Sequence, residues 1–579
     1  MIKPPETIPD KIVRYFAPTL ARKRQQARAM MAVSDYYSGG IQRGRLGGYE
    51  GASRVKRALS TWFPWWRDAN ADIDPDHWLL RSRSRDLVRN NPLAAGAING
   101  VVTNVVGTGL RLHARIDGEF LGMTDEESDS WEADIERRWE QWSESPECDA
   151  AATSNFAQLQ DMAFRGTLES GDIFITLPRF YRRNHPSALH LQLVESDRCS
   201  NPNFLYDTPT CAGGVERDQY GAPTGYHFTK YHPGAMYVGV IPYEWLPVVP
   251  AFSPKSGLRN VLHLYRPLRP DQARGVPYLA PVIEPIKQLG RYTDAEIMAA
   301  VVSGLFTVFI ETEDGDGQLD VEYGTDKPGT TDATNPDNDY RLGNGSIIGL
   351  MPGEKITTAD PKRPNTAFDP FVQAILRQIG TALEVPFEIL IKHFTSSYSA
   401  SRAAILEAWK FFSARRKWLS DNLCNPVYEI WMYEEVVSGR VKAPGFLTDP
   451  IKRKAYLGVV WTGPGRGMID EVKEEAASNL RVLMTKSTLE EETAAQGKDW
   501  KKLIRQTAKE HKILGELGIP PVLTRLPGQP KPAPQETPSG DNSELPPDSG
   551  GSEEGDSGDS SSATHDLALR TFLAAVGGK

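Results

Sequence analysis

The chain has 579 residues, of which 40% are hydrophobic and 24% are charged, as in an ordinary soluble protein of several domains. Its formal net charge is −9, but the stretch from Pro532 to Asp566 alone carries nine acidic residues and no Lys or Arg. The rest of the chain has 66 acidic and 66 basic residues, which argues against a bulk basic surface for gripping nucleic acid.

The cysteines and the hydropathy pattern set the expected compartment. The four cysteines form no close pairs, which argues against a disulfide framework and a zinc site and fits a reducing cytoplasm: Cys148, Cys199, Cys211 and Cys424. The first thirty residues lack the apolar core of a secretory signal. The most apolar run, Ile297–Ile310, is shorter than the roughly 20 residues that a membrane-spanning helix needs. We expect no membrane contact.

Residues 1–60 read as a flexible basic arm, with twelve Lys or Arg against four acids. A solvated tail and a contact with nucleic acid or a partner protein both remain open for it. The ordered body follows, with expected helices over Leu79–Asn90 and Leu93–Val106 and an alternating strand over Leu110–Ile116. Thr124 caps the next helix, and its aromatic stripe is expected in the core: Trp131, Ile135, Trp139 and Trp142.

The next region mixes one helix with short strands. We expect a helix over Phe156–Ser170, ended by Gly171, and then strands over Asp172–Leu177 and Leu189–Val194. Residues 201–270 are rich in Pro, Gly and Tyr and read as a β-rich insertion, with strands over Gly225–Thr229 and Val261–Tyr265.

A helix and a hairpin are expected next. Pro281 and Pro285 lie in or near the first turn of a helix that runs to about Val302. Strands over Leu305–Ile310 and Ser346–Leu350 would pair across an acidic, Gly-rich loop.

The stretch from Asp369 to Trp431 reads as a helix, a Ser-rich loop and a long helix. Asp369 and Pro370 are a helix start signal, and Pro386 forces a stop because it restricts the residue before it. The loop runs from Lys392 to Ser401, and Asn425-Pro426 is expected to kink or break the long helix. Two packed core helices would account for the helical spacing, but not for a serine cluster with one Tyr, one Lys and one His between them.

The C-terminal part begins with a turn over Trp461–Gly467, which we expect to cap and orient a helix over Met468–Thr485. Further helices are expected over Ser487–Ala508 and Glu510–Leu517. The composition of Pro527–Ser562 predicts disorder. The apolar face of Leu569–Val576 fits a docking segment or a frayed end.

Common catalytic patterns are absent. The chain has no G-x-x-x-x-G-K-[ST], no HExxH and no Gly-x-Ser-x-Gly. Ser53 and Lys56 have S-x-x-K spacing but lack its companion motifs. We therefore expect no enzyme, no catalytic residues, no cofactor and no metal site.

Several short motifs, in this order, resemble the lambda-type portal proteins of tailed bacteriophages, the head-to-tail connector family. The resemblance runs from about Tyr36 to Leu526, and its motifs are specific through their order and spacing: Arg85–Asn91, Asn104–Gly109, Glu195–Arg198, Asn201–Asn203, Gln272–Pro277, Leu350–Gly353, Ile379–Pro386, Tyr398–Ala404 and Trp461–Asp470. Glu384 departs from the family, which more often has Gly before Val-Pro.

The resemblance implies an α+β subunit of a ring, usually dodecameric, at one capsid vertex of a virion made in the bacterial cytoplasm. It also implies these regions: 1–60 basic arm, 61–280 wing, 281–304 stem helix, 305–366 clip, 367–386 stem helix, 387–401 tunnel loop, 402–467 long helix and wing return, 468–526 helical crown, 527–579 acidic tail.

The implied function is a conduit for double-stranded DNA during packaging and ejection, with non-specific DNA contact. Implied partners are further copies of the chain, the terminase large subunit, head-completion and tail connector proteins, and the major capsid and scaffold proteins. The expected channel lining is Lys392, His393, Ser396, Ser397, Tyr398, Ser399 and Arg402. A phage-encoded hydrolase and a scaffold without a DNA role are the alternatives.

Overall fold

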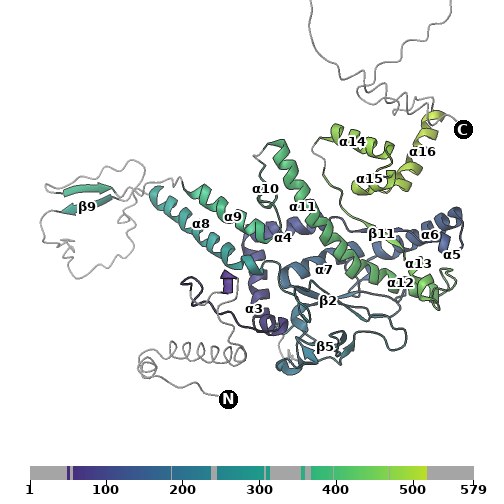
Figure 1. Cartoon of the computed structure of the whole chain (residues 1–579), viewed down its shortest axis with the longest axis horizontal. Helices are drawn as coiled ribbons and strands as arrows, with labels where there is room; N and C mark the ends of the chain where they lie inside the picture. The colour runs from purple at the N-terminus through teal and green to yellow at the C-terminus, as the bar shows by residue number, and fades with distance from the viewer. Residues whose placement is uncertain are drawn as a thin grey trace, which may run out of the picture. The chain divides into compact units, whose positions relative to one another are not determined.

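The computed structural model describes residues 49–52, 56–183, 185–236, 244–304, 308–312, 354–358, 367–394, 397–467 and 470–517. The chain divides into two units, residues 1–503 and 504–579, and every side-chain contact given below lies within the first. It is a mixed helix and sheet protein, as predicted (Figure 1). No helix among the described residues is long and apolar enough to cross a membrane.

The described α-helices range from 4 to 22 residues. They are α3 (Ala69–Asn90), α4 (Pro92–Val105), α5 (Gly118–Leu121), α6 (Asp125–Glu144), α7 (Phe156–Ser170), α8 (Ile283–Gly304), α9 (Phe368–Ala382), α10 (Phe387–Leu390), α11 (Tyr398–Leu419), α12 (Asn425–Val437), α13 (Pro450–Tyr456), α14 (Glu471–Leu483), α15 (Leu489–Ala495) and α16 (Trp500–Glu516).

The strands are short and pair antiparallel in small sheets. They are β1 (Arg111–Ala114), β2 (Asp172–Thr176), β3 (Gln192–Glu195), β4 (Cys211–Ala212), β5 (Val215–Arg217), β6 (Pro223–Tyr226), β7 (Val249–Pro250), β8 (Val261–Tyr265), β9 (Val308–Thr312), β10 (Glu354–Thr358) and β11 (Val459–Thr462). The sheets have the orders β3-β2-β8, β4-β5-β6-β7, β1-β11 and β9-β10. In the central sheet, Ile173 of β2 lies between Glu195 and Leu264.

One large core joins α4, α6 and α7 to the long helix α11–α12, and Figure 1 labels these helices. The predicted aromatic stripe of α6 lies in it, with Ile135, Trp139 and Trp142 buried. The Trp139 ring meets four other aromatic rings edge-on: Phe156, Tyr428, Trp431 and Trp461. A smaller core lies between β2 and the four-stranded sheet.

Local signals fixed several helix ends as predicted. Thr124 and Glu127 form a reciprocal capping box at the start of α6. Gly171 ends α7 with φ +92°, a conformation that a side chain would strain.

The first helix starts ten residues earlier than predicted, because Asp68 caps it by accepting a hydrogen bond from the Ala71 N–H. Pro75 lies inside this helix and cannot donate to the Ala71 carbonyl, and Arg67 Nη1 donates to that oxygen instead, at 3.3 Å.

Several other predicted boundaries were wrong. Helix α9 starts at Phe368, so Asp369 lies in its first turn and does not cap it. The long helix continues through Asn425-Pro426 by way of a π-helical turn, Ser420–Cys424, placed directly before the proline that lacks an N–H. The expected helix over Ser487–Ala508 is split by Gly497, which has φ +76°. Helix α11 begins at Tyr398, so the Ser-rich loop is shorter than expected.

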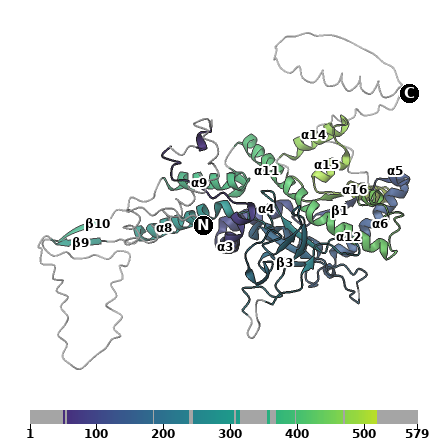
Figure 2. The same ribbon diagram turned by 60° about the horizontal axis from the view of Figure 1, so that its bottom comes forward.

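Strands β9 and β10 pair antiparallel, but β10 starts eight residues after the start of the strand predicted to pair there. The predicted strand Ser346–Leu350 lies outside the described residues, as does most of the acidic loop before it. The basic arm up to residue 48 and the acidic tail lie outside them too. Helices α8 and α9 lie side by side in both ribbon views, and their facing aromatic rings, Tyr292 and Phe368, are 5.6 Å apart (Figures 1 and 2).

Candidate functional site: the loop between the long helices and its supports

The loop between α10 and α11 is anchored at its start and exposed beyond it. Leu390 is buried against the core, and the His393 N–H donates to the Glu388 carbonyl at 3.0 Å. Lys392, at the point of reversal, has φ +55°, which is uncommon for a residue with a side chain. The reversal turns the Lys392 and His393 side chains toward solvent.

The predicted channel residues fall on both sides of the start of α11. Lys392 and His393 lie in the loop, Ser397 directly precedes the helix, and Tyr398 and Ser399 lie in its first turn. All five are exposed. Ser396 lies outside the described residues.

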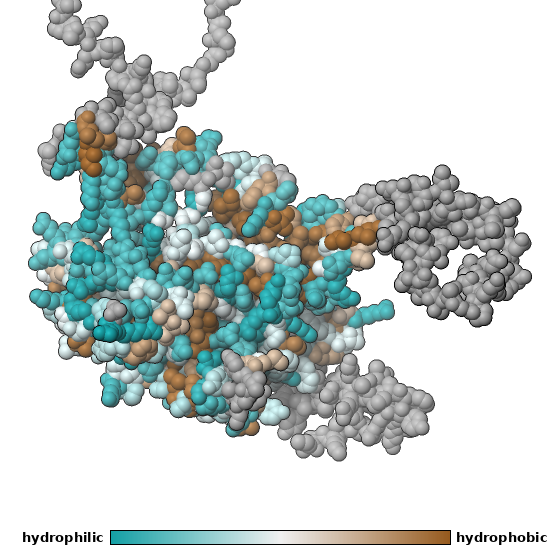
Figure 3. All heavy atoms as spheres, turned by 180° about the vertical axis from the view of Figure 1, so that it is seen from behind, coloured by the Kyte–Doolittle hydropathy of each residue, from teal (hydrophilic) through white to brown (hydrophobic). Residues whose placement is uncertain are grey.

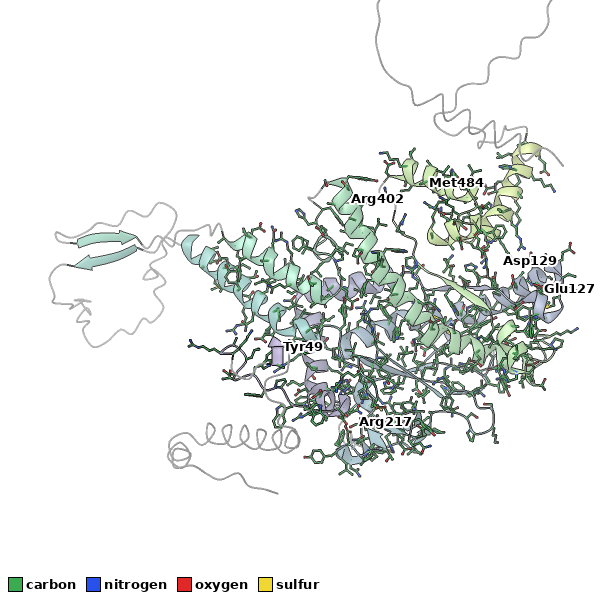
Figure 4. All side chains as sticks on the ribbon, viewed as in Figure 1. Tyr49, Glu127, Asp129, Arg217, Arg402 and Met484 are labelled. Atoms are coloured by element: carbon green, nitrogen blue, oxygen red, sulfur yellow. The ribbon has the colours of Figure 1, made fainter. Side chains whose placement is uncertain are left out.

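Arg402, the last predicted member, contacts a different element. Its Nη2 lies 3.8 Å from Glu474 Oε1 on α14, and Arg466 Nη2 lies 3.3 Å from the other oxygen of the same carboxylate. The Glu474 side chain is only 8% exposed, so this contact is shielded from solvent. Figure 4 labels Arg402 near the start of α11 and Met484 just after α14. Glu474 therefore links the helix that follows the loop to the C-terminal helices.

Farther along α11, Arg416 fixes the helix to two motifs that the sequence singled out. Its guanidinium donates to the carbonyls of Asn104 and Val105 at the end of α4, and to the carbonyl of Pro464 in the Gly-rich turn. Its other face covers the Trp409 ring, 5.0 Å from the ring centroid. One side chain thus joins α4, α11 and the turn after β11.

The glycines of that turn are needed for close approach. A Cβ on Gly463 would lie 2.7 Å from Arg416 Nε, and one on Gly465 would collide with the backbone of Gln496. By contrast, Gly467 has open space around it. The turn therefore packs against the end of α15. Contrary to the expectation from the sequence, it does not cap the helix that follows it, because Asp470 caps α14 by accepting a hydrogen bond from the Lys473 N–H.

Three other motifs of the sequence meet in a buried polar network beside β2. Asp172 is fully buried and accepts hydrogen bonds from Arg274 Nε at 2.6 Å, from the Gly275 N–H at 3.1 Å and from the Ser196 hydroxyl. The Arg274 guanidinium also donates to the carbonyls of Cys199 and Gly213. Its Nη2 donates to Asp172 and to the carbonyl and hydroxyl of Ser196, so every nitrogen of the guanidinium donates a hydrogen bond.

Helix α3 joins the same network through two arginines. Arg81 Nη1 donates to the Ser196 hydroxyl at 2.9 Å, and its Nη2 lies 3.4 Å from Asp197. Arg85 Nη2 lies 2.6 Å from the other oxygen of Asp197. The network ties α3, β2, the turn after β3 and the segment before α8 into one rigid unit.

Burial and charge shift the titration of these groups. Burial alone would raise the pKa of Asp172, but the Arg274 guanidinium and the hydrogen bonds from His263 and Arg274 hold it well below its usual value. Burial and the nearby Arg274 charge lower the pKa of His77 to about 3. Burial and a hydrogen bond with Asp207 raise the pKa of Asp74 to about 8. His77 is therefore neutral, and Asp74 holds a proton near pH 7.

Sequence patterns did not identify Asp172, Glu474 and Arg416 as the residues that make these contacts. The one local sign of Asp172 is a charged residue at the head of an otherwise apolar strand, Asp-Ile-Phe-Ile. Glu474 and Arg416 lie among other charged helix residues, and no local pattern separates them from surface charges.

Two groups of side chains in the described part of the chain have metal-ligand chemistry within 4.8 Å: His113, Glu136 and Asp499, and Glu195, Asp197 and His232. In the second group, the guanidinium groups around Asp197 oppose a cation. In the first, Glu136 accepts from the Ala114 N–H, and Asp499 accepts from the Lys501 N–H at the start of α16. Each group has a structural role without an ion.

Comparison with known proteins places the chain among portal proteins. The sequence profile of a family described as phage portal protein, lambda family, matches residues 55–416. Portal protein B of Escherichia phage lambda is 26% identical over 491 residues, which cover 82% of this chain and 91% of that protein. The portal protein of Escherichia phage N15 is 27% identical, covering 85% and 93%. A probable portal protein of Halomonas phage phiHAP-1 is 24% identical, covering 78% and 84%.

Solved structures show weaker likeness. A chain of the virion of a native gene transfer agent particle has a TM-score of 0.34 and 15% identity, covering 66% of this chain and 93% of that one. A chain of the neck of the native particle, computed with C12 symmetry, has a TM-score of 0.33 and 16% identity, covering 64% and 92%. Similarity at this level adds nothing to what the sequence relatives show.

Proposed function

Because the chain belongs to the lambda family of phage portal proteins, we propose that it assembles into a ring at one capsid vertex and passes double-stranded DNA through the centre. Family membership over residues 55–416 is the observation that carries the proposal. The family is one of structural proteins of the capsid vertex and not of enzymes, so a hydrolase is no longer a competing reading.

The regions of the proposed subunit keep the bounds expected from the sequence. Residues 61–280 would form the wing, with 402–467 returning to it, 281–304 and 367–386 the stem, 305–366 the clip, 387–401 the tunnel loop and 468–526 the crown. In this arrangement α8 and α9 form the stem, and α14 and α15 belong to the crown.

An exposed apolar stripe on α8 supports assembly. Ile297, Met298 and Val301 lie on one side of the helix and are each more than half exposed, and Phe371 of α9 is half exposed. Figure 3 shows hydrophobic surface gathered over these two helices. A contiguous apolar surface of this kind is typical of a protein interface. We propose that the stem helices of neighbouring subunits cover it, in a ring of about twelve copies.

The loop between α10 and α11 fits a channel lining. Its exposed side chains include hydroxyls at Ser397, Tyr398 and Ser399, with Lys392 and His393 as the nearby basic groups. Each phosphate that a protein neutralises adds salt-dependent affinity, so few cations allow weak, passing contacts with the DNA backbone. Arg402 is held by Glu474 and would position the loop more than touch DNA.

The proposed partners follow from the role. The clip would dock the large terminase subunit during packaging and the head-completion and tail connector proteins afterwards. The wing would contact the major capsid and scaffold proteins.

Electron microscopy of the purified full-length protein tests the proposal. We expect closed rings with a central hole, a mass of many subunits by native mass spectrometry, and no ATP hydrolysis. A compact monomer at all concentrations would refute it.

The channel assignment has its own test. Lys392→Ala and Tyr398→Ala should reduce the yield of DNA-filled particles while rings still form. Lys442→Ala, on a turn away from the loop, is the control. Normal packaging by both loop variants would remove these residues from the channel.

A further inference from the structure

A hollow of about 1560 Å³, the α3 hollow, opens beside the buried network. It is lined by α3 and by the segments that precede β4 and α8. Buried side chains of His77, Arg81 and Arg274 reach it from below. Its rim carries exposed apolar side chains: Trp78 is 61% exposed, Leu205 66% and Tyr206 96%. The hollow thus has buried polar groups at its floor and exposed apolar side chains at its rim.

The floor holds polar atoms that the described part of the chain does not satisfy. His77 Nε2, Arg81 Nε, Arg217 Nε and Asp74 Oδ2 are buried and have no hydrogen-bond partner there (Arg217 is labelled in Figure 4). Only 5% of His77 is exposed. Arg81 Nη1 lies 3.3 Å from His77 Nδ1 and can only donate, so the neutral ring carries its proton on Nε2.

These unsatisfied atoms point to a ligand that accepts hydrogen bonds. Buried polar atoms in native proteins nearly always have a hydrogen-bond partner. Several unsatisfied atoms around one hollow therefore indicate a partner that lies outside the described part of the chain. Three of the four are N–H donors, which suit the carbonyl oxygens of an extended peptide.

The charge of the hollow further limits the class of ligand that it can bind. Four arginines and six aspartates line it, and one of the aspartates, Asp74, shares a proton with Asp207. A nearly balanced lining with a slight negative excess disfavours nucleic acid and other polyanions. An uncharged peptide with large apolar side chains fits best.

The chain itself presents such a peptide. The seven residues Ser60–Trp66 have no charged side chain, and residues 62–67 are neither helix nor strand. The exposed aromatic side chains of this segment are Trp62 at 69%, Phe63 at 41%, Trp65 at 56% and Trp66 at 91%.

The segment does not enter the hollow of its own chain. It leads into α3, which forms one wall of that hollow, and Arg67 at the rim lies over the Trp65 ring, 4.7 Å from its centroid. The aromatic side chains remain exposed within a single chain. A second copy can therefore receive them.

We propose that residues 62–66 of one subunit dock into the α3 hollow of the next subunit. This inference rests on the proposed ring. The contact is heterologous, so each copy gives one segment and receives one, and such contacts close into a ring when the rotation between copies allows it. Aromatic side chains would cover Trp78, Leu205 and Tyr206, and segment carbonyls would accept from His77 and Arg81.

Disulfide trapping tests the contact directly. In a Cys211→Ser background, protein with Trp65→Cys is mixed with protein carrying Tyr206→Cys, assembled and oxidised. We expect disulfide-linked dimers from the mixture, and a ladder of covalent multimers when one chain carries both changes. Trp65→Cys with Ile451→Cys is the matched control, because Ile451 is also exposed but lies on α13, and it should give neither product.

A second variant tests the same contact without requiring two cysteine side chains to reach each other. Trp65→Glu should raise the protein concentration needed for assembly at least about tenfold, since buried interface tryptophans dominate binding. Tyr181→Glu, at another exposed aromatic residue that does not line the hollow, should leave assembly unchanged. If rings form but show no crosslinks, and Trp65→Glu does not impair assembly, this inference fails while the proposed function stands. The same holds if the only disulfide that forms lies within one chain. If the wild-type chain forms no ring, the proposed function fails as well.

Discussion

The pair formed by Asp172 and Arg274 gives the sharpest stability prediction. Asp172 is 0% exposed, and Arg274 makes six hydrogen-bond contacts with its carboxylate, with Ser196 and with two backbone carbonyls. Arg274→Met keeps much of the side-chain volume but leaves a buried carboxylate without its charge partner. Breaking a buried pair in this way costs about 3–5 kcal/mol.

That loss is a large share of the roughly 5–15 kcal/mol that keeps a typical domain folded. Urea unfolding followed by far-ultraviolet circular dichroism, at one protein concentration for all variants, measures it. Lys410→Ala is the control, since its ion pair with Glu407 is exposed and worth about 0–1 kcal/mol.

A double variant separates the lost charge pair from lost packing. Asp172→Asn added to Arg274→Met removes the stranded carboxylate, so the double variant should be more stable than Arg274→Met alone. If Arg274→Met unfolds within about 1 kcal/mol of the wild type, or if the two changes simply add, the network does not hold α3, β2 and the segment before α8 together.

Three further predictions concern the turn at Gly465, the ion pair between Glu474 and Arg402, and the dependence of stability on pH. Gly465→Ala should expose residues 468–499 to limited proteolysis, because its added Cβ would collide with backbone at the end of α15, whereas Gly467→Ala has open space and should not. Glu474→Gln should speed hydrogen exchange in the first turn of α11 by weakening the ion pair with Arg402, and Glu471→Gln should leave that exchange unchanged. The pKa of Asp74 is about 8 in the folded chain, compared with its ordinary value of 3.8. The contribution of Asp74 to stability is therefore complete below about pH 4 and is lost as the pH rises toward 8. The Tm of Asp74→Asn should therefore lack that part of the wild-type decline between pH 5 and 8.

Local sequence signals were sufficient to predict many of the elements, and the ordered motifs were sufficient to predict the family. Spacing and caps gave α7 to the residue, the capping box at Thr124, the buried stripe of α6 and the pair of helices around the Ser-rich loop. These signals are local, because a cap or a periodic face depends on residues within one or two turns of each other. The ordered motifs carried the family resemblance, which the comparisons confirmed.

The contacts that the motif residues make depend on the tertiary structure. Arg81, Asp172, Ser196 and Arg274 meet in one network although 193 positions separate the first from the last, as their residue numbers show. Long-range hydrogen bonds of this kind leave no trace in helical or strand periodicity. The same holds for the α3 hollow, whose unsatisfied donors exist only because α3 and the β4 region face each other. Which side chains are buried without a partner is a property of the packed chain, since burial and pairing both depend on residues far apart in sequence.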